Sequence, residues 1–100
     1  MYQCTTPTHI FKLPISVTEK ARIRLTYKQD DAVILTKKNK DCVLEGQKVS
    51  CTLTQADTLS FDHKKKVKIQ LHILTEEGKA LITPIYYKKV GECIAGEVIA

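Results

Sequence analysis

Strict alternation of apolar and polar side chains is the sequence feature that most restricts the fold of this chain. Between residues 20 and 27 every second side chain is apolar, and the same pattern runs from residue 67 to residue 73. Side chains along a strand point alternately to the two faces of a sheet, whereas helical spacing would mix the two sets. Both segments are therefore predicted to be strands with one buried face.

Further short strands are predicted along the rest of the chain. They cover residues 9–13, 32–36, 42–44, 48–53 and 81–87. Thr54 directly follows the predicted strand 48–53. The segment Thr54–Asp57 fits a single helical turn, because Thr54 can cap it and Asp57 stands at the capping-box position. Pro84 cannot donate a ladder hydrogen bond, so the strand 81–87 is expected to be bulged or to lie at a sheet edge.

Six to seven short antiparallel strands, with one helical turn near residues 54–58, predict an all-β protein. An immunoglobulin-like β-sandwich is the favoured architecture and a small β-barrel is the alternative. The length of 100 residues fits a single β-sandwich domain spanning 1–100. The tail from Gly91 to Ala100 either adds a final strand or docks elsewhere. With no long apolar run and no leader, neither a membrane span nor a secretory signal is expected.

The cysteines Cys4, Cys42, Cys51 and Cys93 show neither a C-x-x-C pair nor a zinc-ligand spacing. No metal and no cofactor are therefore expected. Without a leader, the expected compartment is a reducing cytoplasm with four free thiols. Cys42 and Cys51 flank a hairpin, but a tight turn at Glu45-Gly46 would place Cys42 opposite Val49, so a disulfide between the two is not predicted.

Catalysis is not expected from the sequence. Asp62-His63 is the only adjacent acid and imidazole, and it lies beside three lysines in what reads as a solvated turn. A general base needs a second reacting group and some desolvation, and the sequence indicates neither. His9 and His72 have no metal-ligand neighbour at the usual spacing. The chain is therefore predicted not to be an enzyme.

The chain is basic, with a formal net charge of +5, and 14 of its 16 basic residues are lysines. The candidate basic patch comprises Arg22, Arg24, Lys64, Lys65, Lys66 and Lys68. Proteins that bind single-stranded nucleic acid interleave such charge with exposed aromatic residues, and at least three of the six aromatic residues here are expected in the core. Lysine-rich faces more often keep sheets soluble and separate. Nucleic acid is therefore the less favoured partner.

Exposed strand edges are the favoured contact surfaces. An edge strand can pair with another protein, main chain to main chain, and the strands 9–13 and 81–87 are the candidate edges. Because Tyr86 and Tyr87 are adjacent, one of them must point outward in a regular strand, where it would serve as a contact anchor. The candidate protein interface comprises Leu81, Thr83, Ile85, Tyr86 and Tyr87.

Several stretches resemble a group of small prophage-encoded proteins from Firmicutes. These stretches are Thr6–Pro14, Cys42–Gly46, Leu53–Gln55, Asp57–Leu59 with Phe61, Val67–Leu71 and Leu74–Leu81. The resemblance covers most of the chain but contains no chemical motif. It implies an accessory component of a phage tail, baseplate or virion, with other phage structural proteins or further copies of this chain as partners and no membrane. The implied location is the host bacterial cytoplasm during assembly, or the virion. Related chains tend to end in an acidic tail, whereas Gly96–Ala100 carries less charge.

Overall fold

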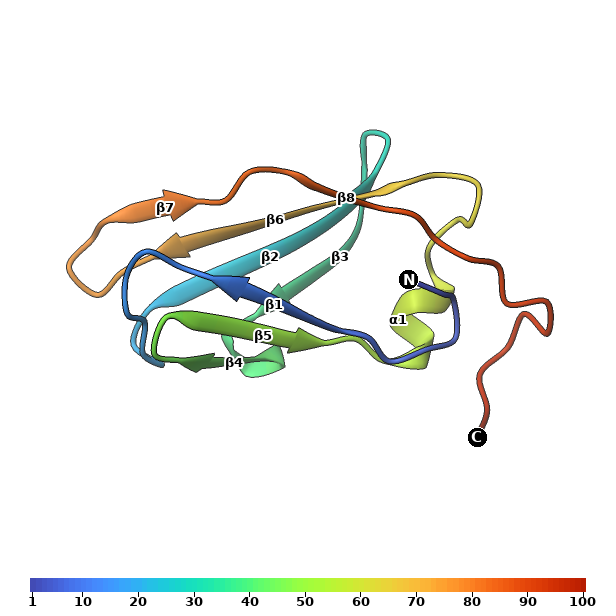
Figure 1. The fold of residues 1–100 in the computed structure, drawn as a ribbon, viewed down its shortest axis with the longest axis horizontal. Coiled ribbons are helices and arrows are strands. Elements are labelled where there is room, and N and C mark those ends of the chain that lie inside the picture. Colours follow the sequence, from blue (N-terminus) through green and yellow to red (C-terminus); the bar gives the residue numbers. More distant parts are fainter.

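The computed structural model describes residues 1–100 as two antiparallel β-sheets. The strands are β1 (Thr8–Lys12), β2 (Arg22–Gln29), β3 (Ala32–Lys38), β4 (Cys42–Glu45), β5 (Lys48–Thr52), β6 (Val67–Leu74), β7 (Ala80–Ile82) and β8 (Tyr86–Lys88), and the helices are η1 (Asn39–Asp41) and α1 (Gln55–Leu59). One sheet has the order β1-β5-β4, and the other has the order β3-β2-β6-β7, with β8 also paired to β6 (Figure 1). No strand pairs across the two sheets. The predicted sandwich is thereby confirmed, and the sheets do not close into a barrel.

The alternating apolar residues of the central strands form the core, as predicted. The register sets Leu25 of β2 opposite Leu71 of β6, and both side chains are fully buried. Val49 of β5, in the other sheet, is equally buried and belongs to the same cluster of apolar residues. Burying one such side chain contributes roughly 1.5–3 kcal/mol. The alternation therefore sets which face of each sheet turns inward.

The β4–β5 hairpin turns one residue later than predicted. Glu45 pairs with Lys48, so the two-residue loop is Gly46-Gln47 and not Glu45-Gly46. Gly46 has φ +59°, as the first central residue of a tight hairpin turn requires. The prediction had placed this glycine second in the loop. The shift corrects the pairing of Cys42, which lies opposite Cys51 and not opposite Val49.

The predicted helical turn is confirmed as α1, which carries the chain from β5 in one sheet to β6 in the other. Thr54 accepts a hydrogen bond of 3.0 Å from the amide of Asp57, and the Asp57 carboxylate accepts one of 2.9 Å from the amide of Thr54. These two bonds form the capping box expected from the sequence. No helix in the structure has the length and hydropathy needed to cross a membrane.

The segment predicted as one strand, 81–87, forms two short strands on either side of Pro84. β7 and β8 both pair with β6, with Ile82 opposite His72 and Tyr86 opposite Ile69. Between these two pairs, three residues of the edge (83–85) lie opposite two residues of β6 (70 and 71). Pro84 therefore lies in a β-bulge at the edge of the sheet. Because of this split, the structure has eight strands, whereas six to seven were predicted. The tail from Gly91 forms no strand.

The hydroxyl of Thr83 replaces a main-chain partner in this bulge. The Thr83 amide donates to the carbonyl of Leu71 at 3.0 Å, while the Leu71 amide donates to the Thr83 hydroxyl, also at 3.0 Å. A backbone amide buried without an acceptor would cost about 1–3 kcal/mol. Thr83 therefore keeps β6 satisfied where the neighbouring strand is interrupted.

Candidate interaction surfaces

The outer edge of the larger sheet, residues 80–88, carries a run of exposed apolar side chains and is called here the β7–β8 edge. The exposed fraction is 47% for Ile85, 45% for Tyr86 and 58% for Tyr87. Ile82, which the sequence interpretation left out, is also exposed, because β7 turns it to the outer face of the sheet. The edge thus combines aromatic and aliphatic surface with a strand side that pairs with nothing.

Two residues of the predicted interface have structural roles within the β7–β8 edge. Leu81 is half-buried and packs against the core. Thr83 is half-buried and hydrogen-bonds to Leu71. The exposed part of the predicted set is therefore Ile85, Tyr86 and Tyr87.

The bulge decides which tyrosine faces outward. Tyr87 lies opposite Lys68, on the outer face, whereas Tyr86 lies opposite the buried Ile69. Tyr86 points toward the rim between the sheets, where its ring centroid lies 5.9 Å from that of Phe11. A regular strand would have placed Tyr86 on the same face as Ile82, because every second side chain of a strand points to the same face of the sheet.

A hollow of about 360 Å³ opens at this rim between β1 and β8. Its lining includes His9, Phe11 and Tyr86. A hydrogen bond of 2.7 Å joins the Nδ1 atom of His9 to the hydroxyl of Tyr27, which is fully buried. Burial lowers the pKa of His9, and the positive charges of Lys88 and the N-terminus lower it further. His9 is thus held neutral as a link between the two sheets.

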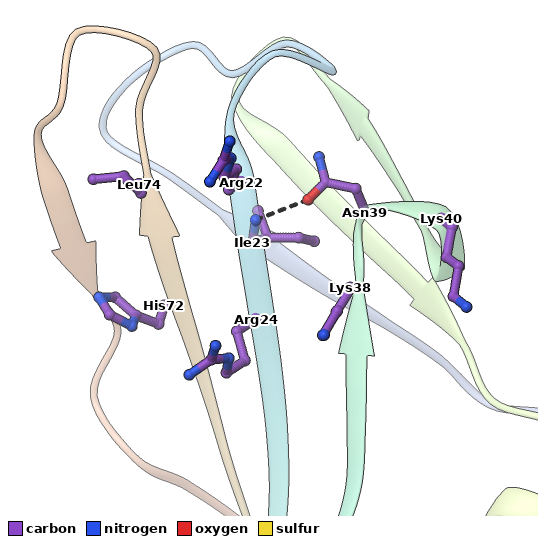
Figure 2. Close-up of a pocket in the computed structure, with 8 residues that line it drawn as sticks. All are labelled: Arg22, Ile23, Arg24, Lys38, Asn39, Lys40, His72 and Leu74. Carbon is purple, nitrogen blue, oxygen red and sulfur yellow. Dashed lines mark hydrogen bonds between the residues drawn. The ribbon is translucent and has the colours of Figure 1, made fainter.

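A second hollow, of about 580 Å³, lies on the outer face of the larger sheet and is lined by positive charge (Figure 2). We call it the cationic hollow; its charged and imidazole side chains are those of Arg22, Arg24, Lys38, Lys40 and His72. Strand register brings them together, because Arg24 lies opposite Lys38 on one side and His72 on the other. No carboxylate lines this hollow.

Asn39 fixes the position of η1 beside this hollow. Its side-chain oxygen accepts a hydrogen bond of 2.9 Å from the amide of Ile23 (Figure 2). Its side-chain nitrogen donates one of 2.6 Å to the carbonyl of Ala21. The side chain therefore ties η1 to the start of β2, next to Arg22 and Arg24.

The structure divides the predicted basic patch into two parts. Arg22 begins β2, whereas the loop carrying Lys64, Lys65 and Lys66 is held at the far end of that strand. There the side chain of Gln29 donates to the carbonyls of Asp62 and Lys65 at 2.8 and 3.0 Å. An eight-residue strand separates its ends by about 23 Å.

Lys68 lies in the same part as the loop lysines, opposite Lys28 near that end of β2. Lys38, Lys40 and His72, and not these lysines, accompany Arg22 and Arg24. The sequence interpretation missed them because strand register brings them beside the arginines from separate segments.

The Asp62-His63 pair is arranged as a turn. The Asp62 carboxylate accepts a hydrogen bond of 2.8 Å from the amide of Lys64, which is the local bond that shapes such turns. The His63 ring lies 3.5 Å from the exposed carboxylate of Glu92. No group of three His, Cys, Asp or Glu side chains gathers as a metal site would require. Both residues therefore make local structural contacts in this turn.

Comparison with known proteins finds no matching family model, no similar curated protein and no similar solved structure. Two surfaces of the structure are therefore the candidates for a functional contact. The β7–β8 edge is apolar and has an unpaired strand side, and the cationic hollow is polar and positively charged.

Proposed function

We propose that this chain is a non-enzymatic interaction domain that docks onto other proteins through the β7–β8 edge. The observation that carries the proposal is the exposure of Ile85, Tyr86 and Tyr87 along a sheet edge whose outer side is unpaired. Tyrosine side chains are frequent anchors in protein interfaces. An unpaired strand also offers main-chain hydrogen bonds to an incoming strand.

The proposed setting is a phage or prophage particle, in its tail or baseplate. The resemblance to small prophage-encoded proteins supports this setting. The partners would be other phage structural proteins or further copies of this chain, since such assemblies are built with rotational symmetry. The domain would meet them in the host bacterial cytoplasm during assembly and remain in the virion.

The test measures how much of the domain enters purified particles. Tagged wild-type chain, Tyr87→Ser and Val43→Ser are expressed while the prophage produces particles, and each is quantified in the particles by mass spectrometry. Val43 is the matched control, because it lies on β4 of the other sheet and its exposed fraction, 61%, is close to the 58% of Tyr87. Exposed substitutions of this kind usually change stability by less than about 0.5 kcal/mol.

The proposal predicts that wild type and Val43→Ser enter particles equally. The amount of Tyr87→Ser in particles should be about tenfold lower, because this variant loses one contact anchor. Equal incorporation of all three chains would show that the β7–β8 edge is not the contact surface. Absence of the wild-type chain from particles would remove the particle setting.

A second candidate function is a nucleic-acid-associated or regulatory phage factor. The cationic hollow favours it, because two arginines and two lysines surround a cavity that no carboxylate lines. Backbone phosphates are the ligands that such a surface attracts, and their binding weakens steeply with salt. Filter binding of DNA and RNA at low and physiological salt tests this candidate with an Arg22→Gln/Arg24→Gln variant. Retention at physiological salt that this variant abolishes would place this function first.

A further inference from the structure

Cys4 and Cys93 lie near opposite ends of the chain, and main-chain pairing brings them together. Tyr2 and Gly91 form a parallel bridge, in which the amide of Gln3 donates to the carbonyl of Gly91 at 3.0 Å. The side-chain oxygen of Gln3 accepts a hydrogen bond of 3.0 Å from the amide of Cys93. The residue before Cys4 is thus bonded directly to Cys93, which places the two cysteines near each other.

Neither thiol is buried in the core. The neighbouring Cys4 lowers the pKa of the Cys93 thiol, and the backbone amide of Gly96 lowers it further. The neighbouring Cys93 raises the pKa of the Cys4 thiol. A thiol that ionises readily, is reachable from solvent and has a second thiol beside it is the arrangement that reacts with disulfides.

Cys42 and Cys51 form a second pair of adjacent thiols, but in a different environment. They lie directly opposite each other in the β4–β5 ladder, and Cys51 is 1% exposed. The neighbouring Cys51 and burial both raise the pKa of Cys42. In this second pair one of the two thiols, Cys51, is closed to solvent, so the pair provides an internal control.

We propose that Cys4 and Cys93 are a modification site, a dithiol that closes to an intramolecular disulfide when it meets a small-molecule or protein disulfide. The Cys93 thiolate attacks one sulfur of the oxidant, whose S–S bond breaks and releases one thiolate. Cys4 then loses its proton and attacks the Cys93 sulfur, which releases the second thiolate. The two protein thiols are oxidised, the oxidant disulfide is reduced to two thiols, and the two protons pass to the released sulfurs.

Closure would fasten the start of the C-terminal tail to the N-terminal segment. The tail already contacts α1, where the Gln55 side chain accepts a hydrogen bond of 2.9 Å from the amide of Ile99 and donates one of 3.1 Å to its carbonyl. A disulfide at Cys93 would hold the other end of this tail covalently. The inference concerns thiol chemistry and does not depend on the proposed docking function.

The experiment exposes the reduced full-length chain to oxidised glutathione and follows intact mass and non-reducing peptide maps over time. Three variants are compared with wild type: Cys4→Ser, Cys93→Ser and Gly91→Ala. The last keeps both thiols, but a Cβ at residue 91 would clash with the ring of Tyr2, so Tyr2, two residues before Cys4, must shift. Circular dichroism checks that each variant is folded.

In wild type, the proposal predicts loss of two hydrogen atoms in mass and a peptide in which Cys4 is linked to Cys93, before Cys42 or Cys51 reacts. Cys4→Ser should accumulate glutathione on Cys93, and Cys93→Ser should accumulate it on Cys4, because neither variant keeps a second thiol that could displace the glutathione. Gly91→Ala should show a longer-lived glutathione adduct. Stable glutathione adducts on wild-type Cys93, or earlier closure of Cys42 with Cys51, would overturn the proposal.

Discussion

The ion pair between Lys37 and Asp57 leads to a quantitative prediction about the stability of the fold. Lys37 belongs to β3 of the larger sheet, whereas Asp57 lies in α1, which follows β5 of the smaller sheet. The Lys37 Nζ atom lies 2.8 Å from the Asp57 Oδ2 atom, and their side chains are only 16% and 15% exposed. The pair therefore joins the two halves of the sandwich in a nearly dry environment.

The structure allows the cost of breaking this pair to be bounded. Fully exposed pairs contribute about 0.2–1 kcal/mol, and removing one partner of a buried pair costs about 3–5 kcal/mol. For this partly buried pair, Lys37→Met should cost about 2 kcal/mol, or about 8–16 °C in midpoint for a domain of this size. Asp57→Ala should cost about 3 kcal/mol, because it also removes the carboxylate half of the capping box, worth about 1 kcal/mol.

A double-mutant cycle isolates the pair from the cap. Urea unfolding followed by circular dichroism measures wild type, both single variants and the double variant. Lys37→Met should cost almost nothing in the Asp57→Ala background, since the partner is already gone. An equal cost of Lys37→Met in both backgrounds would refute the reasoning, because the effect would then come from the lysine stem alone.

The pH dependence of this pair has a definite sign. Burial alone would raise the pKa of Asp57, but the hydrogen bonds from Lys37 and Thr54 outweigh it and lower the pKa below 3.8. The pair therefore contributes its full stability above that value and loses it as the pH falls through the lowered pKa. The stability difference between wild type and Lys37→Met should be constant from pH 7 to about pH 5 and shrink in stronger acid.

Two further predictions concern single hydrogen bonds. Tyr27→Phe removes the bond to His9 and should cost about 1 kcal/mol in urea unfolding. Because the pKa of His9 is lowered from 6.5, wild-type stability should fall as the pH drops below 6.5, and His9→Gln should remove that part of the slope; an unchanged slope would exclude His9 as its source. Thr83→Val leaves the Leu71 amide without its acceptor and should cost about 1–3 kcal/mol, whereas Thr83→Ser should cost less. Equal losses in the two Thr83 variants would rule out the hydroxyl.

The features that sequence predicts well here are those with local causes. Alternation in residues 67–73 identifies β6, because burying one face requires apolar residues at every second position. The capping box of α1 depends only on Thr54 and Asp57, three residues apart. In contrast, the order of strands and the pairing of Cys4 with Cys93 depend on contacts between distant segments, which no local pattern encodes.

The errors come from shifts of one residue and from distances along strands. The predicted hairpin register was wrong by one residue, because Gly46 supplies the positive φ at the first loop position and not at the second. The bulge at Pro84 exchanged the faces of Tyr86 and Tyr87 relative to a regular strand. The basic patch was predicted by counting charges, whereas strand length separates Arg22 from the lysines of the 64–66 loop.

The most direct test of the docking account is amide hydrogen exchange of the domain, free and in particles isolated from producing cells. In the free domain, the amides of β2, β5 and β6 should exchange slowest, because these strands are paired on both sides. On assembly, the account predicts new protection at the amides of residues 85–88 and unchanged exchange in β4. New protection confined to β4, or to the cationic hollow, would contradict it.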